Sequence, residues 1–265
     1  MNNSNRRRFS SAGFTLIEMI IVIAIMAIVA GAMAPLAVRM IDSSRQDTTV
    51  KRQQLIYQAI LGDPSTHGTG FLSDMGRIPG GNLTELAVQG ALPSYVIQAC
   101  GVGMGWRGPY LLEGTDQTGQ PLDGWGTPMD FSGGQIRSAG PDRSMATTAD
   151  NLYYPAVPIT ANNIYGSIAI KVFALDTSTA QPTYVPAGGQ ATIYFAQNGT
   201  MQSVTAASAN GSYIFPTAGL NLPQGIHAIN VTGDPDGPGP QPPVTNSITV
   251  FCPGGGTAHQ TVALR

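Results

Sequence analysis

An apolar run from Phe14 to Val38 constrains the fold of this chain more than any other feature. As a helix, its 25 residues would rise about 37 Å, enough to cross about 30 Å of membrane hydrocarbon. Three arginines, residues 6–8, precede the run, and no acidic residue occurs among the first 17. The positive-inside tendency therefore places the N-terminus in the cytoplasm and exports the rest of the chain.

A single charge, Glu18, interrupts the apolar run. A carboxylate inside a membrane-spanning helix costs about 2.5–3.5 kcal/mol on insertion scales, and such groups usually face a partner instead of lipid. The small residues from Ala30 to Ala34 imitate a signal-peptide cleavage site poorly. We therefore expect the run to remain as an anchor and Glu18 to have a partner.

The sequence from Gly13 to Glu18, GFTLIE, resembles the cleavage and methylation motif of type IV prepilins and pseudopilins. The resemblance implies that prepilin peptidase cuts after Gly13 and that the new N-terminal Phe14 is N-methylated. It also implies that the amine of Phe14 pairs with Glu18 of a neighbouring subunit. Two groups that are costly in lipid become less costly together, so this pair would set the register between subunits. The alternative is a plain membrane anchor with an incidental glutamate.

Apolar residues at helical spacing continue from Ile41 to Ile60, and Gly62 followed by Pro64 favours a helix end there. The pattern predicts one helix over residues 14–61. If unbroken, it would be about 72 Å long.

Pro35 lies inside this predicted helix, four residues after Gly31. Both residue types weaken a helix, and proline removes one backbone hydrogen bond. Two interpretations remain open for Pro35. It is either an ordinary kink in a membrane helix or an assembly feature, where the helix loosens as subunits leave the bilayer.

Residues 63–151 are rich in glycine and proline and carry only short apolar groups. We expect loops, a short helix around residues 83–88, a small antiparallel sheet against the polar half of the long helix, and little core. Three stretches resemble the major pseudopilin of type II secretion systems: Asp74–Pro79 (DMGRIP), Trp106–Leu111 (WRGPYL) and Asp123–Pro128 (DGWGTP). The resemblance implies a pilin fold, with the long helix packed on a small antiparallel sheet.

The stretch from Ser138 to Asn151 resembles the calcium loop of the same family. The resemblance implies a Ca²⁺ site with ligands from Ser138, Asp142, Thr147, Asp150 and Asn151. Calcium takes about six to eight oxygen ligands, which these residue types can supply. The family pattern is not fully kept: Arg143 stands where glycine is usual, the loop is one residue longer, and Asn151 replaces an acid. The alternative is a polar turn in which Arg143 pairs with Asp142 or Asp150 in place of the metal.

The composition changes at Leu152, and the resemblance ends there. Seven short runs are rich in β-branched and aromatic residues, with turn signals such as Asn198-Gly199 and Asn210-Gly211 between them. The runs cover residues 164–175, 191–196, 200–206, 212–215, 226–231, 247–252 and 258–264. This pattern predicts an immunoglobulin-like β-sandwich over residues 152–265.

The predicted sandwich is poor in charge. From residue 151 onward the charged side chains are Lys171, Asp176, Asp234, Asp236 and Arg265. The chain has no hydrolase elbow, paired metal histidines or phosphate loop, so we expect no enzyme. It also has no basic patch, so we expect no nucleic-acid partner. The neutral surface is either an ordinary exported β-domain or a surface for neighbouring subunits or a glycan-rich target.

Cys100 and Cys252 are the two cysteines of the chain. Export would place both in an oxidising compartment, where a disulfide can form. Sequence does not show whether the two sulfurs meet, so a bridge and two free thiols remain equal alternatives.

The resemblance implies a pseudopilin of a type II secretion system, a structural subunit processed by prepilin peptidase and assembled through its N-terminal helix. Its implied partners are identical or related subunits, an inner-membrane assembly platform and membrane lipid. The alternative is a surface type IV pilus subunit or tip adhesin whose sandwich binds a target. Either would sit in the bacterial inner membrane with its bulk periplasmic, and the filament would lie in the periplasm or at the cell surface.

The expected organisation follows from these features. A leader (residues 1–13) precedes the transmembrane and assembly helix (14–38) and the periplasmic part of the same helix (39–62). A pilin-like globular part (63–151) and the β-sandwich (152–265) complete the chain.

Overall fold

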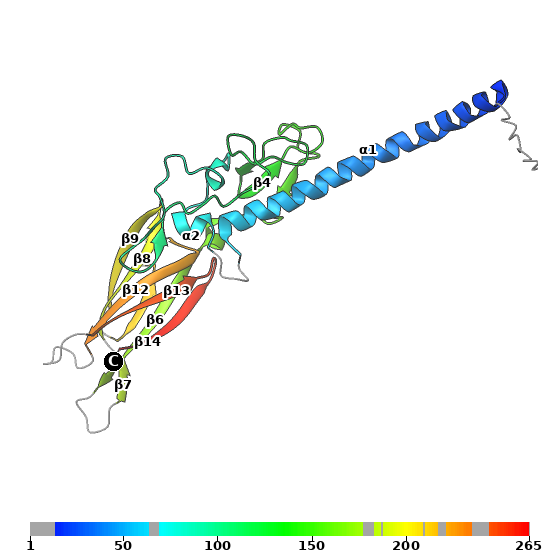
Figure 1. The fold of residues 1–265 in the computed structure, drawn as a ribbon. Coiled ribbons are helices and arrows are strands. Elements are labelled where there is room, and N and C mark those ends of the chain that lie inside the picture. Colours follow the sequence, from blue (N-terminus) through cyan, green and yellow to red (C-terminus); the bar gives the residue numbers. More distant parts are fainter. Residues whose placement is uncertain are drawn as a thin grey trace, which may run out of the picture. The chain divides into compact units, whose positions relative to one another are not determined.

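One long helix opens the computed structural model, which describes residues 14–63, 69–176, 183–186, 188–208, 210–216, 221–234 and 244–264. This helix, α1 (Leu16–Leu61), runs without a break through Pro35 (Figure 1). It ends at Gly62, whose φ of 86° is left-handed and whose N–H donates to the Gln58 carbonyl at 2.7 Å. Glycine adopts this conformation readily, so the helix ends where its sequence predicts.

The chain divides within α1 into two compact units, Met1–Gln46 and Asp47–Arg265. From Leu16 onward the first unit is helical. The second unit contains the last turns of α1, a loop-rich part (residues 69–160) and a β-sandwich (residues 165–264).

Short elements and turns make up the loop-rich part. The elements are α2 (Phe71–Met75), the 3-10 helix η1 (Thr84–Leu86), β1 (Val96–Ile97), β2 (Gly103–Met104), β3 (Asp130–Ser132), β4 (Gln135–Ser138) and β5 (Leu152–Tyr154). β1 pairs with β2, and β3, β4 and β5 form an antiparallel sheet. Because β5 pairs with β4, this sheet extends past the predicted boundary after residue 151, and the sandwich begins later, at Tyr165.

The loop-rich part has a substantial core, so the expectation of little core was wrong. Its fully buried side chains come from α1, α2, η1, β4 and the residues just before η1 and β3. They include Ile56, Ile60, Phe71, Met75, Leu83, Leu86, Met129 and Ile136. The rings of Phe71 and Tyr110 meet edge to face with centroids 5.6 Å apart. Short apolar groups that lie far apart in the sequence thus collect around the last turns of α1.

Polar side chains of α1 bind the loops that cover it. The Gln53 amide donates to the carbonyls of Ile136 at 3.1 Å and Leu152 at 3.0 Å. Arg52 donates to the carbonyls of Leu122 and Asp123, each at 2.9 Å. Buried backbone carbonyls need such partners where no ladder supplies them.

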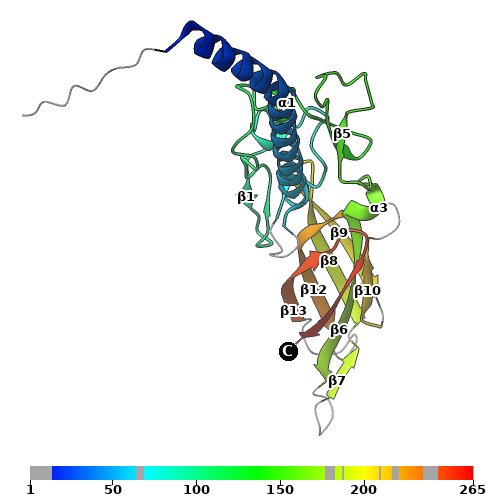
Figure 2. The same ribbon diagram turned by 90° about the vertical axis from the view of Figure 1, so that its right-hand side faces the viewer.

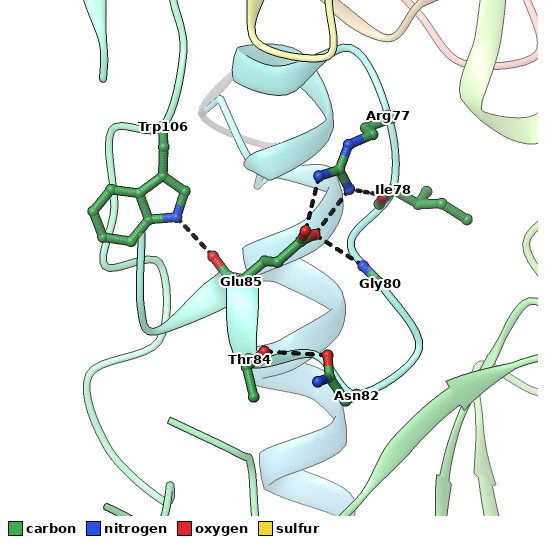
Figure 3. Close-up of polar contacts among 7 residues, drawn as sticks. All are labelled: Arg77, Ile78, Gly80, Asn82, Thr84, Glu85 and Trp106. Atoms are coloured by element: carbon green, nitrogen blue, oxygen red, sulfur yellow. Dashed lines mark hydrogen bonds and ion pairs between the residues drawn. The ribbon is translucent and has the colours of Figure 1, made fainter. Parts of the chain in front are cut away.

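Glu85 organises the turn before η1 (Figure 3). Arg77 forks onto its carboxylate with bonds of 2.8 and 2.9 Å, and the Gly80 N–H donates to the same carboxylate at 2.9 Å. The Trp106 indole donates to the Glu85 carbonyl at 2.7 Å. These bonds lower the pKa of Glu85, with the Arg77 contact contributing most.

Two of the three motif stretches meet at Asp74. Its carboxylate accepts from the Tyr110 hydroxyl at 2.9 Å and pairs with Arg107 at 3.0 Å. Burial raises the pKa of Asp74 to about 6, although Arg107 and Tyr110 both act in the opposite direction. The stretches 74–79 and 106–111 therefore form one folded site within the loop-rich part.

The sandwich consists of two sheets. Its strands are β6 (Tyr165–Asp176), β7 (Thr183–Pro186), β8 (Gly188–Gln197), β9 (Thr200–Ser208), β10 (Ser212–Phe215), β11 (Leu222–Pro223), β12 (Gly225–Asp234), β13 (Val244–Cys252) and β14 (Thr257–Leu264); the helix α3 (Ala161–Ile164) precedes them (Figure 2). One sheet has the order β13-β12-β8-β9. In the other, β6 pairs antiparallel with β7, β10 and β11 and parallel with β14.

The two sheets bury a common apolar core. It includes Ile168 and Ile170 of β6, Ile193 and Phe195 of β8, and Phe215 of β10. Each of the seven predicted runs overlaps one long strand or hairpin arm, and Asn198-Gly199 forms the turn between β8 and β9. The structure confirms the predicted fold, a pilin-like α+β domain followed by a β-sandwich. It has the long N-terminal helix, the small antiparallel sheet and the sandwich.

The sandwich packs directly against α2 and the β1–β2 hairpin. The Gly199 N–H donates to the Met75 carbonyl at 2.8 Å, and Val102 and Met104 form a small apolar cluster with Ala196 and Ala228. A Cβ on Gly76 would lie 1.9 Å from the Ala196 carbonyl oxygen. The contact therefore requires glycine at this position.

The two cysteines are free in the structure. Cys100 packs beside the cluster of Val102 and Ala228, whereas Cys252 lies in the sandwich core. Of the two alternatives that the sequence leaves open, the structure therefore has separate thiols and no Cys100–Cys252 bridge. Burial raises the pKa of Cys252 to about 12, which keeps it as an unreactive thiol.

Candidate functional site

The start of α1 is capped by its own side chains. Thr15 precedes the first helical residue, and its hydroxyl accepts the Glu18 N–H at 3.3 Å. The Glu18 carboxylate in turn accepts the Thr15 N–H and the Thr15 hydroxyl, each at 2.9 Å. This reciprocal arrangement is a capping box, which satisfies backbone donors that a helix start leaves unpaired.

Glu18 keeps one oxygen available. Both bonds from Thr15 reach Oε2, and among the described residues no group donates to Oε1. The carboxylate also lies in the first turn of the helix, where the helix dipole favours negative charge. Glu18 is thus anchored by one oxygen and can accept a cation through the other.

The apolar side chains of the first unit are exposed. Phe14 is 83% exposed, and the large apolar residues from Leu16 to Ile41 are all about half exposed or more. They surround the helix instead of forming a stripe. α1 is long and apolar enough to cross a membrane. Such an all-round apolar helix needs lipid or other helices to cover it.

The predicted cleavage residue Gly13 and the predicted assembly residue Pro35 remain to be placed. Gly13, the predicted cleavage position, lies outside the described residues. Pro35 lies within the continuous helix, and residues 28–36 are helical throughout. In this single chain the proline therefore does not end or interrupt α1, and its role in assembly stays a prediction.

The loop predicted to hold calcium brings together three of the five predicted residues, Asp142, Thr147 and Asp150. The Asp142 N–H donates to the Asp150 carboxylate at 3.2 Å, and the Thr147 hydroxyl bonds the Asp142 carboxylate. The Thr147 bond and the Ser144 N–H lower the pKa of Asp142. Asn151 follows Asp150 and is buried, and neither atom of its amide group has a partner.

Ser138 is the predicted ligand that the structure separates from this group. Its hydroxyl donates to the buried Asp123 carboxylate at 2.7 Å and accepts the Gly140 N–H at 3.2 Å. The Ser138 side chain therefore holds the base of the loop closed. Among the described residues Arg143 forms no ion pair with Asp142 or Asp150, so the alternative in which Arg143 replaces the metal is not observed.

Comparison with known proteins identifies the N-terminal segment. The family described as "Prokaryotic N-terminal methylation motif" matches residues 8–34, which include Gly13, Phe14 and Glu18. No curated protein matches the chain. The motif and the long apolar helix support a type IV pilin-like subunit that prepilin peptidase processes. The motif implies assembly into pilin-like filaments, and the family of proteins that carry it is structural and not enzymatic. The apolar helix is consistent with membrane anchoring.

Sequence reasoning missed the role of Thr15. The signal was present, because a Thr followed three residues later by Glu just before an apolar run is the sequence signature of a capping box. The capping signature is easily overlooked here, because the methylation motif already accounts for a glutamate at position 18.

Proposed function

We propose that this chain is a secretion-type pilin-like subunit, a pseudopilin, that polymerises through α1. The observation that carries the proposal is the exposed apolar surface from Phe14 to Ile41, interrupted near its start by the single carboxylate of Glu18. Lipid covers that surface before assembly, and the helices of neighbouring subunits cover it afterwards.

Glu18 has a specific part in this assembly. After cleavage behind Gly13, the charged amine of Phe14 of one subunit meets Glu18 of the next. Thr15 holds Oε2, so the carboxylate is oriented, and Oε1 accepts the incoming amine. Breaking such a pair in an apolar surrounding is costly, because the remaining partner becomes an uncompensated charge. The pair fixes the register between subunits.

The secretion branch is supported by the motif stretches of the loop-rich part. Asp74, Arg107 and Tyr110 join two of them. In the third, the Asp123 carboxylate accepts the N–H groups of Trp125 at 2.9 Å and Thr127 at 2.8 Å. These residues build the fold instead of lining a reaction centre, as a structural subunit requires.

We propose that Ca²⁺ stabilises the loop 138–151. The side chains of Asp142, Thr147 and Asp150 supply oxygen, and the Asn151 amide, which is buried without a partner among the described residues, offers one more oxygen beside Asp150 in the chain. This donor set suits a hard cation, and bound calcium would neutralise the two carboxylates. Ser138 would contribute by closing the base of the loop and not through its hydroxyl.

Two substitutions separate the charge of Glu18 from its capping role. Glu18→Gln keeps the cap, because glutamine also serves in a capping box, but removes the charge. Thr15→Val removes the cap and keeps the charge, at about 1 kcal/mol for the start of the helix. We expect both variants to be cleaved, and filament yield to fall at least tenfold for Glu18→Gln while Thr15→Val assembles.

Mass spectrometry of the mature N-terminus and electron microscopy of sheared filaments measure the two steps. Normal filaments from Glu18→Gln would contradict the pairing. The copy number in the filament tests the branch: a polymer of this chain alone supports a filament subunit, whereas a few copies at a tip support the alternative, a surface subunit that presents the sandwich.

A further inference from the structure

A polar cleft of about 400 Å³ lies on the sandwich, beside the junction of α3 and β6. Figure 2 shows how α3 leads into β6. Asn162, Tyr165, Ser167, Asn221, Gly256 and Thr257 are among its lining residues. They come from α3, from the start of β6, from the residue before β11 and from the turn into β14. Its size falls within the range of about 300–1,000 Å³ typical of small-molecule sites.

The lining of the cleft is neutral. Among the described residues no carboxylate, amine or guanidinium lines it, and none offers a hydrogen-bond partner to the Asn162 and Asn221 amides or to the Tyr165 hydroxyl. Each amide can donate two hydrogen bonds and accept two. The cleft therefore presents unpaired donors and acceptors side by side, together with one aromatic ring.

The wall of the cleft is fixed by backbone contacts. The Gly255 N–H donates to the Tyr165 carbonyl at 3.0 Å, and the Ser167 N–H donates to the Gly256 carbonyl at 2.9 Å. A Cβ on Gly166 would lie 2.1 Å from the Pro253 carbonyl oxygen, and one on Gly254 would lie 2.0 Å from the Asn163 carbonyl oxygen. Two backbone segments thus meet more closely than side chains allow, which fixes the backbone from which Tyr165 and Ser167 project.

We propose that this cleft binds a neutral saccharide. Sugar hydroxyls both donate and accept, as the two amides do, and a sugar carries no charge that would need a counter-ion. The Tyr165 ring supplies an apolar face with a polar tip, which suits the mixed surface of a pyranose. This site uses none of the residues of α1 and is independent of which filament the subunit enters.

The test is saturation-transfer NMR on the full chain in detergent. The probes are glucose, galactose, mannose, N-acetylglucosamine and lactose, with N-acetylneuraminic acid as a charged comparison. We expect at least one neutral sugar to bind. Asn162→Ala and Asn221→Ala should each weaken its Kd by about threefold to tenfold, because each removes amide hydrogen bonds.

Gln202→Ala is the matched control, since Gln202 is an exposed amide on β9 in the other sheet. It should leave the Kd unchanged, and Tyr165→Phe should retain the ring contact while losing the hydroxyl. The proposal is overturned if no neutral sugar binds, if only the charged sugar binds, or if the Asn162→Ala/Asn221→Ala double variant binds as tightly as the native chain. Circular dichroism of each variant shows that the sandwich remains folded.

Discussion

The loop-rich part and the sandwich are held together by different interactions. The Asp123 side chain and Gln53 of α1 each bind two backbone groups of the loop-rich part, and Glu85 binds the Gly80 N–H. Arg77, Arg107 and Arg137 form ion pairs there. In the sandwich, ladders such as β8–β9 pair the backbone with itself, and the interior is almost wholly apolar. The stability of the loop-rich part therefore depends on a few polar side chains, and that of the sandwich on close packing of its apolar core.

The two tryptophans allow this difference to be measured. Trp106 and Trp125 both lie in the loop-rich part. Their fluorescence reports on that part. Detergent keeps the apolar part of α1 helical in urea, so the change in far-UV circular dichroism on unfolding comes chiefly from the long strands of the sandwich. Urea unfolding of the full chain in detergent, followed by both signals, therefore compares the two parts in one experiment.

The largest expected effect is a cavity in the sandwich. Phe215→Ala removes a fully buried ring and should lower the free energy of unfolding by about 3–5 kcal/mol. The circular dichroism transition should move first. Ile214→Ala, on the same strand but 64% exposed, should change the midpoint little. Equal effects from both variants would show that packing of the apolar core is not what stabilises the sandwich.

Asp123→Ala should have the next largest effect, and it acts on the loop-rich part. It leaves the N–H groups of Trp125 and Thr127 and the Ser138 hydroxyl without their buried acceptor, so we expect a loss of about 2–4 kcal/mol by tryptophan fluorescence. Asp116 makes a similar set of bonds in an exposed turn. Asp116→Ala is the control and should cost less than about 1 kcal/mol.

Acid should affect the two parts in opposite directions. Burial lowers the pKa of His227 in β12 from 6.5 to about 4, so the folded sandwich keeps this ring neutral while an unfolded chain takes up a proton. Stability from His227 is complete above pH 6.5 and falls by up to about 3 kcal/mol as the pH approaches 4. His227→Gln should abolish this loss, measured as urea midpoints between pH 7 and pH 4.

Asp74 provides the opposing case. Its pKa of about 6 lies above the ordinary value of 3.8, so its protonation stabilises the folded chain as the pH falls from 6 toward 3.8. Asp74→Asn should remove that gain. If His227→Gln leaves the acid dependence of the circular dichroism signal unchanged, buried His227 is not its cause.

The smallest expected effect is that of calcium on the loop 138–151. With a Kd typical of exported modules, about 10 mM Ca²⁺ should add about 1–3 kcal/mol to the free energy of unfolding. Asp142→Asn and Asp150→Asn should each remove this increment, while Asp116→Asn should retain it. A melting temperature that a chelator does not change in the native chain would retire the calcium proposal.

Sequence predicted the regular elements of this fold better than its irregular ones. The helix over residues 14–61 and the seven strand runs follow from apolar spacing and from turns such as Asn198-Gly199, which are local signals. The core around Ile56 and Phe71 and the parallel pairing of β14 with β6 were not predictable in the same way. They depend on contacts between residues that are distant in the chain, which no local pattern records.

The candidate sites show the same division. The methylation motif was readable because its residues are consecutive, and the comparison finds that motif at residues 8–34. In the calcium loop, the sequence grouped Ser138 with Asp142, although the Ser138 hydroxyl turns to Asp123 instead. The saccharide cleft combines residues from Asn162 to Thr257 and leaves no motif in the sequence.

The capping box at Thr15 and Glu18 also determines where α1 begins. A residue at the N-cap has non-helical backbone, so the helix cannot extend backward past Thr15. Phe14 therefore lies outside the hydrogen-bonded turns of α1. The same two side chains that orient Glu18 thus keep Phe14, whose amine we propose as the partner of Glu18 on the next subunit, outside the helix.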